Sequence, residues 1–146
     1  MTEKAASAPA RNRWTLLAVI SIGTLSSTLD GGIVSVAYPA LARAFSVGTS
    51  TVLWVTVAYW VTAVGLLLTL GWIGDVVGRR RVFATGLAVF AAGVLLAGLS
   101  TTIWQLIAFR VLQGVGSAMV LSNLNALITT NFPARDRGKA LGVSGA

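Results

Sequence analysis

The sequence predicts an all-α, polytopic membrane protein with four transmembrane helices and the start of a fifth. Of its 146 residues, 55% are hydrophobic and only 10% are charged, and a soluble domain needs more polar surface than that. The apolar residues come in blocks of about 20, the length that a helix needs to cross a hydrocarbon layer of about 30 Å. Short clusters that hold most of the charge separate these blocks.

The first span is expected at about residues 14–37, after a tail of residues 1–13. It is longer than the apolar core of a signal peptide, which has about 7–15 residues, so we expect an uncleaved helix. Pro39 is expected where this helix loosens or ends, because proline disrupts a helix interior. A polar connector at residues 43–51 leads to the second span, expected at about residues 52–73.

Residues 74–81 are too rich in glycine and arginine to stay in lipid, and they predict a short turn. The third span is expected at about residues 82–99, and a tight link at residues 100–102 joins it to the fourth, at about 103–130. Pro133 is expected to stop that helix. Another apolar run begins at residue 140, so that residues 14–146 form a partial N-terminal transmembrane domain.

Lysine and arginine in the connectors predict the orientation, because cytoplasmic loops carry an excess of both. The connectors on one side carry nine of them and those on the other side carry only Arg43. We therefore expect a multi-pass protein of the cell membrane with a cytoplasmic N-terminus. The nine are Lys4, Arg11, Arg13, Arg79, Arg80, Arg81, Arg135, Arg137 and Lys139.

The charge and the missing residue types exclude several classes of function. The net charge is +7, but the basic residues lie at block ends and form no continuous stripe, so no nucleic-acid partner is expected. The chain has no cysteine and no histidine, which excludes disulfides, thiol chemistry and histidine proton relays. We expect no metal site, no cofactor and no enzymatic activity, and proton chemistry must use carboxylates.

Two charges lie well inside the apolar spans, Asp30 in the first and Arg110 in the fourth. An unpaired charge at the membrane centre costs about 2.5–3.5 kcal/mol or more, so each needs a partner or a water-filled cavity. Both are expected in the outer half of the membrane, where they are natural partners. Movement of the arginine would load or release a proton on Asp30; the alternative is a static ion pair between two helices.

Other polar residues offer weaker signals. Asp75, in the second connector, can pair with an arginine across the turn and hold two helix ends in one conformation. The run at residues 79–81 suits either a gating role or topology and lipid contact. Gln113, Asn123 and Asn125 are neutral polar groups in the fourth span, and hydrogen bonds between helices are the favoured interpretation for the two asparagines.

The stretch GWIGDVVGRRR at residues 71–81 resembles the signature loop between spans two and three of the major facilitator superfamily. Val76 stands where the superfamily usually has a basic residue. Residues 110–118, RVLQGVGSA, resemble the signature of span four, whose arginine is linked to proton transfer in the family. The matching positions are Gly71, Asp75, Gly78, Arg79 and Arg80 in the loop, and Arg110, Gln113, Gly114 and Gly116 in span four.

A third stretch, LDGGIVSVAYP at residues 29–39, resembles the span-one motif of the fourteen-span drug:proton antiporter branch. Gly32 and Ser35 replace the usual threonine and asparagine. The three motifs lie in the order and on the spans where the family has them, and the resemblance covers nearly all of the chain after Arg13. It is a resemblance to the N-terminal part of such a transporter.

The resemblance implies a transporter that exports small, drug-like or cationic molecules in exchange for protons, with the lipid membrane and the remainder of the transporter as partners. It implies that Asp30 carries the proton, that Arg110 modulates it, and that Asp75 with Arg79 and Arg80 forms a cytoplasmic latch. Two alternatives remain open. One is a truncated, non-transporting membrane fragment of such a transporter, and the other is a small efflux protein that works as a homo-oligomer.

Overall fold

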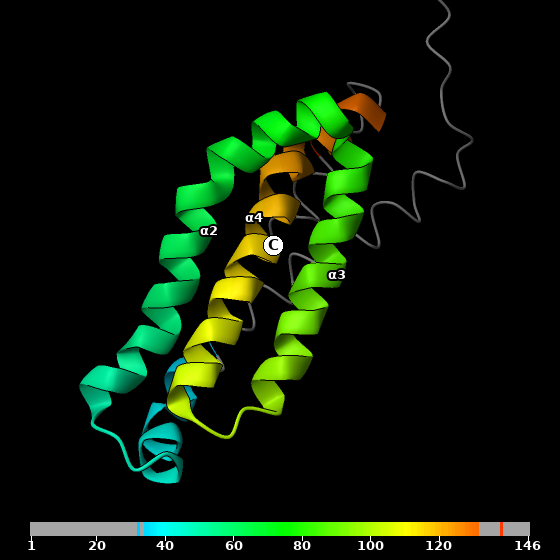
Figure 1. Cartoon of the computed structure of the whole chain (residues 1–146). Helices are drawn as coiled ribbons and strands as arrows, with labels where there is room; N and C mark the ends of the chain where they lie inside the picture. The colour runs from blue at the N-terminus through cyan, green and yellow to red at the C-terminus, as the bar shows by residue number, and fades with distance from the viewer. Residues whose placement is uncertain (1–31, 33, 132–137, 139–146) are drawn as a thin grey trace, which may run out of the picture.

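A computed structural model describes residues 32, 34–131 and 138, and every regular element among them is a helix. A helix at residues 34–44 precedes α2 (Thr49–Val77), α3 (Arg79–Gly98) and α4 (Ile103–Asn131) (Figure 1). The predicted all-α class is confirmed. Most of the expected first span, and the expected start of a fifth, lie outside the described residues.

The described part of the chain contains three helices long and apolar enough to cross a membrane, at Thr49–Val77, Arg79–Gly98 and Ile103–Thr130. They overlap the second, third and fourth expected spans, at about 52–73, 82–99 and 103–130. Their sequence and length give a multi-pass membrane protein, because a helix satisfies its backbone hydrogen bonds within itself and so tolerates lipid.

The helices extend further than the hydropathy of the sequence suggests. The polar turn expected at residues 74–81 is reduced to Gly78, whose φ of 110° reverses the chain between α2 and α3. Helix formation continues through the charged residues because long side chains at helix ends can reach the polar interface. The helix at 34–44 likewise passes Pro39. Of the two alternatives expected there, a loosened helix or its end, the end is ruled out, because proline is tolerated in membrane helices when neighbouring groups satisfy the backbone.

The link between α3 and α4 is a short segment with side-chain caps. Thr102 Oγ1 accepts a hydrogen bond from the Gln105 backbone N–H at 3.3 Å, and Gln105 Oε1 accepts one from the Thr101 N–H at 3.0 Å. These bonds satisfy backbone donors that the first turn of a helix leaves open. They explain why α4 begins at Ile103.

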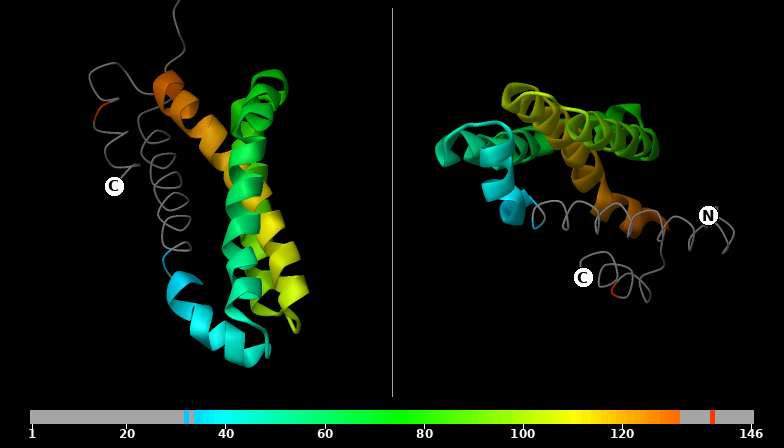
Figure 2. Two further views of the ribbon diagram at one scale, coloured as in Figure 1. Left: turned by 90° about the vertical axis from the view of Figure 1, so that its left-hand side faces the viewer. Right: turned by 90° about the horizontal axis from the view of Figure 1, so that it is seen from below.

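Helix α4 lies between α2 and α3 and contacts both extensively, whereas α2 and α3 contact each other little (Figure 1). In the most apolar 18-residue window of each helix, 53% of the window is buried in α4, against 22% in α2 and 28% in α3. The two views of Figure 2 show the helix at 34–44 beside the end of the bundle where α4 begins. Its Tyr38 hydroxyl lies 2.7 Å from Thr56 Oγ1 of α2.

Two apolar clusters hold the bundle together at its two ends. The first cluster joins residues from the helix at 34–44, α2 and α4, and the second cluster joins α3 to α4 near the end of α4. The polar stretch of α4 that includes Arg110 and Gln113 lies between them. The buried members are Val34, Val55, Ile103 and Leu106 in the first cluster, and Phe83, Val120, Leu127 and Ile128 in the second.

Candidate functional site

Arg110 lies inside the bundle and is held by a residue one turn further along α4. Its Nη1 donates a hydrogen bond of 2.9 Å to Gln113 Oε1, and the two side chains are only 8% and 1% exposed. The spacing of three residues places both on one face of the helix. The arrangement presents a permanent cation in a setting where its field is weakly screened.

Gln113 owes its position to a glycine on the neighbouring helix. A Cβ at Gly93 of α3 would lie 2.6 Å from the Cγ of Gln113 and 3.1 Å from its backbone nitrogen, closer than packed atoms approach. Only a residue without a side chain lets α3 come this near. The close approach fixes the amide that in turn accepts from Arg110.

The two glycines of the span-four motif pack α4 against different neighbours. A Cβ at Gly114 would lie 2.7 Å from the Tyr59 carbonyl oxygen of α2, and one at Gly116 would lie 2.5 Å from the Phe90 backbone nitrogen of α3. Small residues at such crossings let membrane helices approach backbone to backbone. The motif is therefore the place where α4 is clamped on both sides, beside Arg110.

A second buried polar contact follows one turn after Gln113. The Tyr59 hydroxyl of α2 donates to Ser117 Oγ at 3.0 Å, and both side chains are almost fully buried. Arg110, Gln113 and Ser117 thus form a polar row along α4, at spacings of three and four residues. Neither Tyr59 nor Ser117 was predicted as a polar contact from the sequence; the available signal was the four-residue spacing of Ser117 from Gln113.

Asp30, the expected partner of Arg110, lies outside the described residues. The pairing of these two residues stays a prediction. Arg110, Gln113, Gly114 and Gly116 are brought together at one level of the bundle, and the residues of the loop motif lie at the end where α2 meets α3 (Figure 1).

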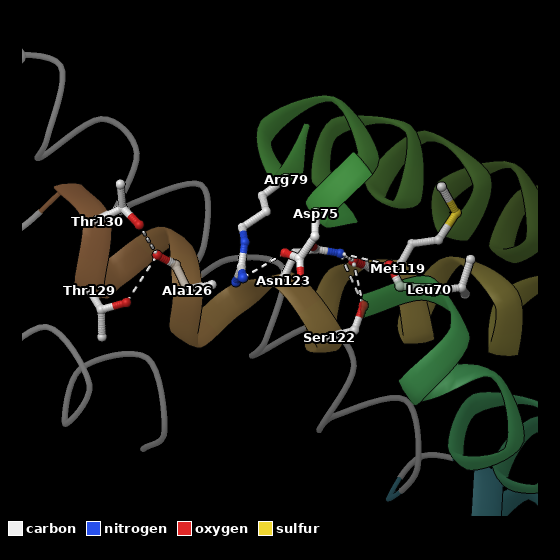
Figure 3. Close-up of polar contacts among 9 residues, drawn as sticks. All are labelled: Leu70, Asp75, Arg79, Met119, Ser122, Asn123, Ala126, Thr129 and Thr130. Atoms are coloured by element: carbon white, nitrogen blue, oxygen red, sulfur yellow. Dashed lines mark hydrogen bonds and ion pairs between the residues drawn. The ribbon is translucent and has the colours of Figure 1, made fainter. Parts of the chain in front are cut away.

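The turn between α2 and α3 carries an ion pair. Arg79 Nη2 lies 2.6 Å from Asp75 Oδ1, with side-chain exposures of 40% and 53% (Figure 3). Asp75 is in the last turn of α2 and Arg79 is the first residue of α3, so each charge opposes the dipole of its own helix. The pair offsets both, and exposed pairs of this kind contribute only about 0.2–1 kcal/mol. Such a contact breaks easily.

The remaining loop residues divide into packed and exposed ones. Gly71 faces α4, where a Cβ would make an ordinary contact of 3.6 Å with the Cβ of Ser122. Arg80 and Arg81 are exposed, and with Val77, Gly78, Arg79 and Ala84 they line an open hollow. This end of the bundle therefore presents concentrated positive charge.

The sequence pattern of the Major Facilitator Superfamily matches residues 20–146. The chain belongs to the major facilitator superfamily. Members of this superfamily are transporters rather than enzymes. The three expected motifs, at residues 29–39, 71–81 and 110–118, all lie within the matched residues.

Relatives of this superfamily chain carry names from several kinds of transport. Riboflavin transporter RibZ of Clostridioides difficile is 35% identical over 136 residues, which are 93% of this chain and 30% of that protein. The puromycin resistance protein pur8 of Streptomyces alboniger is 40% identical over 139 residues (94% and 28%). The multidrug transporter protein MdtP of Bacillus subtilis is 34% identical over 134 residues (92% and 25%). The chain spans less than a third of each.

Proposed function

We propose that the transporter to which this chain belongs exports small molecules across the cell membrane in exchange for protons, with the N-terminus in the cytoplasm. The observation that carries the proposal is Arg110, a cation buried within a membrane-spanning helix and oriented by Gln113. A charge in that position is expensive and marks a functional pathway by default.

Asp30 is the proposed proton carrier. A nearby arginine favours the ionised form of a carboxylate, and its withdrawal favours the protonated form. Because Gln113 and the glycine contacts fix Arg110 to α4, a shift of α4 relative to the first span would change the distance between guanidinium and carboxylate. Proton uptake and release would then follow the movement of the helices.

Export of drug-like compounds is supported by the names of two relatives, a puromycin resistance protein and a multidrug transporter. The name of another relative, a riboflavin transporter, supports a substrate class broader than drugs. The class that all three names share is a small organic molecule.

The gating role of the loop is supported by the weakness of its ion pair. Asp75 and Arg79 close the turn with an exposed contact that thermal motion or a competing partner can open. We propose that this pair, with Gly71, Gly78 and Arg80, forms the cytoplasmic latch that opens and closes once in each transport cycle.

The test is proton-driven efflux of a fluorescent organic cation from vesicles that contain the transporter expressed from the reading frame that holds this chain. We expect efflux to require the gradient, to stop in Asp30→Asn and to fall strongly in Arg110→Ala. Efflux that survives Asp30→Asn, or that persists after a protonophore collapses the gradient, would overturn the proposal. The 146-residue chain assayed alone tells whether these helices suffice for transport.

A further inference from the structure

Asn123 connects the gating loop to the helix that carries Arg110. It lies on α4 with 0% of its side chain exposed, and its Nδ2 donates to the Met119 carbonyl at 3.0 Å and to Ser122 Oγ at 3.0 Å. The same nitrogen reaches across to α2, 3.5 Å from the Leu70 carbonyl oxygen (Figure 3).

The other side of the amide faces Gly74. A Cβ at residue 74 would overlap Asn123 Oδ1 and lie 2.8 Å from its Cγ. Among the glycines of the described residues, no other approach to a side chain is as close. The amide therefore contacts α2 on two consecutive turns, at Leu70 and at Gly74, and any side chain at residue 74 would expel it.

Asn123 Oδ1 is itself buried and accepts no hydrogen bond within the described part of the chain. A buried carbonyl oxygen without a donor is costly, so an apolar residue would serve simple packing better. The presence of an amide at this position is explained if its role is to hold the α2 backbone through its N–H groups, with its oxygen against Gly74.

This contact stands immediately before the latch. Gly74 precedes Asp75, and the Gly74 carbonyl accepts the Gly78 N–H at 3.0 Å, which closes the last turn of α2. The turn that presents Asp75 to Arg79 is thus anchored to α4 through Asn123. On the same helix, Arg110 lies 13 residues away, or roughly 20 Å along the axis.

We propose that Asn123 is a positioning residue that couples the two sites: a movement of α4 that originates at Arg110 is passed through the Asn123 amide to Gly74, and so to the Asp75–Arg79 latch. The inference rests on the proposed function and extends it, because it names the contact by which proton binding reaches the cytoplasmic gate. Packed side chains, hydrogen bonds and rigid helices that have two arrangements carry coupling over distances of about 20–40 Å.

The experiment follows the gate without a substrate. In the full transporter, a Val76→Cys thiol on the exposed last turn of α2 is alkylated by a membrane-impermeant maleimide, with and without a proton gradient. In the otherwise unsubstituted protein the gradient should change the alkylation rate about fivefold or more, the lower end of typical coupling between sites. Asn123→Leu, which keeps the volume but removes the amide, should abolish that change, and so should Gly74→Ala.

Two controls separate coupling from structural damage. Thr129→Val removes a side-chain hydrogen bond that stays within α4, and Gly65→Ala adds a methyl group to α2 where nothing lies within 4 Å; both should keep the gradient response. If Gly74→Ala fails to reach the membrane, Gly74→Ala/Asn123→Ala replaces it, since the added methyl fills the space of the removed amide, and it should also lack the response.

The outcomes are distinct for the inference and for the proposed function. A gradient response that survives in Asn123→Leu or in Gly74→Ala would overturn the inference. Efflux without any gradient response of the Val76→Cys thiol would also overturn the inference and leave the proposed function intact. A gradient response without efflux would support the inference and refute the export of that cation.

Discussion

Arg110 illustrates how a charged residue is accommodated within an apolar bundle. Its guanidinium donates to Gln113, whose Cγ and backbone pack closely against Gly93. A hydrogen bond to a charged group contributes about 1.5–3 kcal/mol, against about 0.5–1.5 kcal/mol for a neutral pair. The buried pair should therefore matter more to stability than the neutral Tyr59–Ser117 contact one turn away.

This difference can be measured. Gln113→Leu should lower the free energy of unfolding by about 1.5–3 kcal/mol, and Ser117→Ala by about 0.5–1.5 kcal/mol, because only the first removes an acceptor from a cation. Reversible unfolding of the purified transporter in mixed detergent micelles gives both values. Equal losses in the two variants would show that the Arg110–Gln113 bond carries no special weight.

The latch makes the opposite prediction, a small effect on stability with a large effect on transport. Asp75→Asn removes one charge of an exposed pair, so unfolding should change by no more than about 1 kcal/mol. Transport should nevertheless fall several-fold in its maximum rate, since the closed turn is no longer held. Stability and efflux are compared in the same preparation, and Arg81→Ala, outside the ion pair, is the matched charge change at this turn.

The sequence identifies those residues whose energetic cost follows from their position along the chain alone. Arg110 stands out because a charge interrupts an apolar span, and Asp75 because it belongs to a turn. Tyr59 gave no signal at all, since a neutral polar side chain in a span is inexpensive. Asn123 was expected to form a hydrogen bond between helices, and it does so with α2, but its partner could not be named from the sequence. Their partners, Ser117 and Leu70, lie 58 and 53 residues away, and only the packing of the helices shows which faces meet.

Helix α4 is the element on which the others are assembled. Gly114 and Gly116 are two residues apart, about 200° around a helix with 3.6 residues per turn. They consequently face opposite neighbours, α2 and α3. A single motif therefore packs three helices, which explains why α4 is the most buried of the three.

Added volume at this crossing should be destabilising. Gly116→Ala places a methyl group against the Phe90 backbone and the Gly86 carbonyl oxygen, and overpacking of this kind costs about 1–3 kcal/mol. Gly98→Ala on α3, where nothing lies within 4 Å, is the control and should change stability little. A thermal melt of both variants in detergent decides the matter; equal melting temperatures would contradict the backbone contact.

The existence of the helices was predictable and their ends were not. Apolar blocks of about 20 residues identified α2, α3 and α4, but the charged residues that seemed to close a helix are part of it. Arg79 begins α3, and Asp75 lies within α2. Hydropathy measures preference for lipid, whereas a helix ends only where its backbone turns, here at Gly78.

At the scale of the whole molecule, the charges should set one orientation in the membrane. The turn at Gly78 carries three arginines, and the opposite end of the bundle, around residues 45–48, carries only Arg43 nearby. In this cysteine-free chain, Ser46→Cys should react with an impermeant maleimide only from outside the cell, and Arg80→Cys only from the cytoplasm. Labelling of Ser46→Cys from the cytoplasmic side would contradict the predicted topology.

The bundle also leaves a broad apolar surface uncovered by the described helices. Along α2 the exposed side chains recur on one face at helical spacing, and most of the helix outside its contact with α4 remains accessible. In a membrane such a surface meets lipid or further helices. The exposed members on that face include Trp54, Val57, Val61, Val64, Leu68 and Trp72.

The turn at Gly78 has a genetic consequence. One residue separates α2 from α3, and an inserted residue that lengthened either helix would rotate the residues beyond it by about 100°. Gly86 and Gly93 would leave α4, and bulky side chains would take their places. In a library of single-codon insertions sorted for surviving transport, insertions at this turn should therefore be rare and insertions near residues 45–48 should be common. The number of residues in the turn is then under selection, as a side chain in a binding site would be.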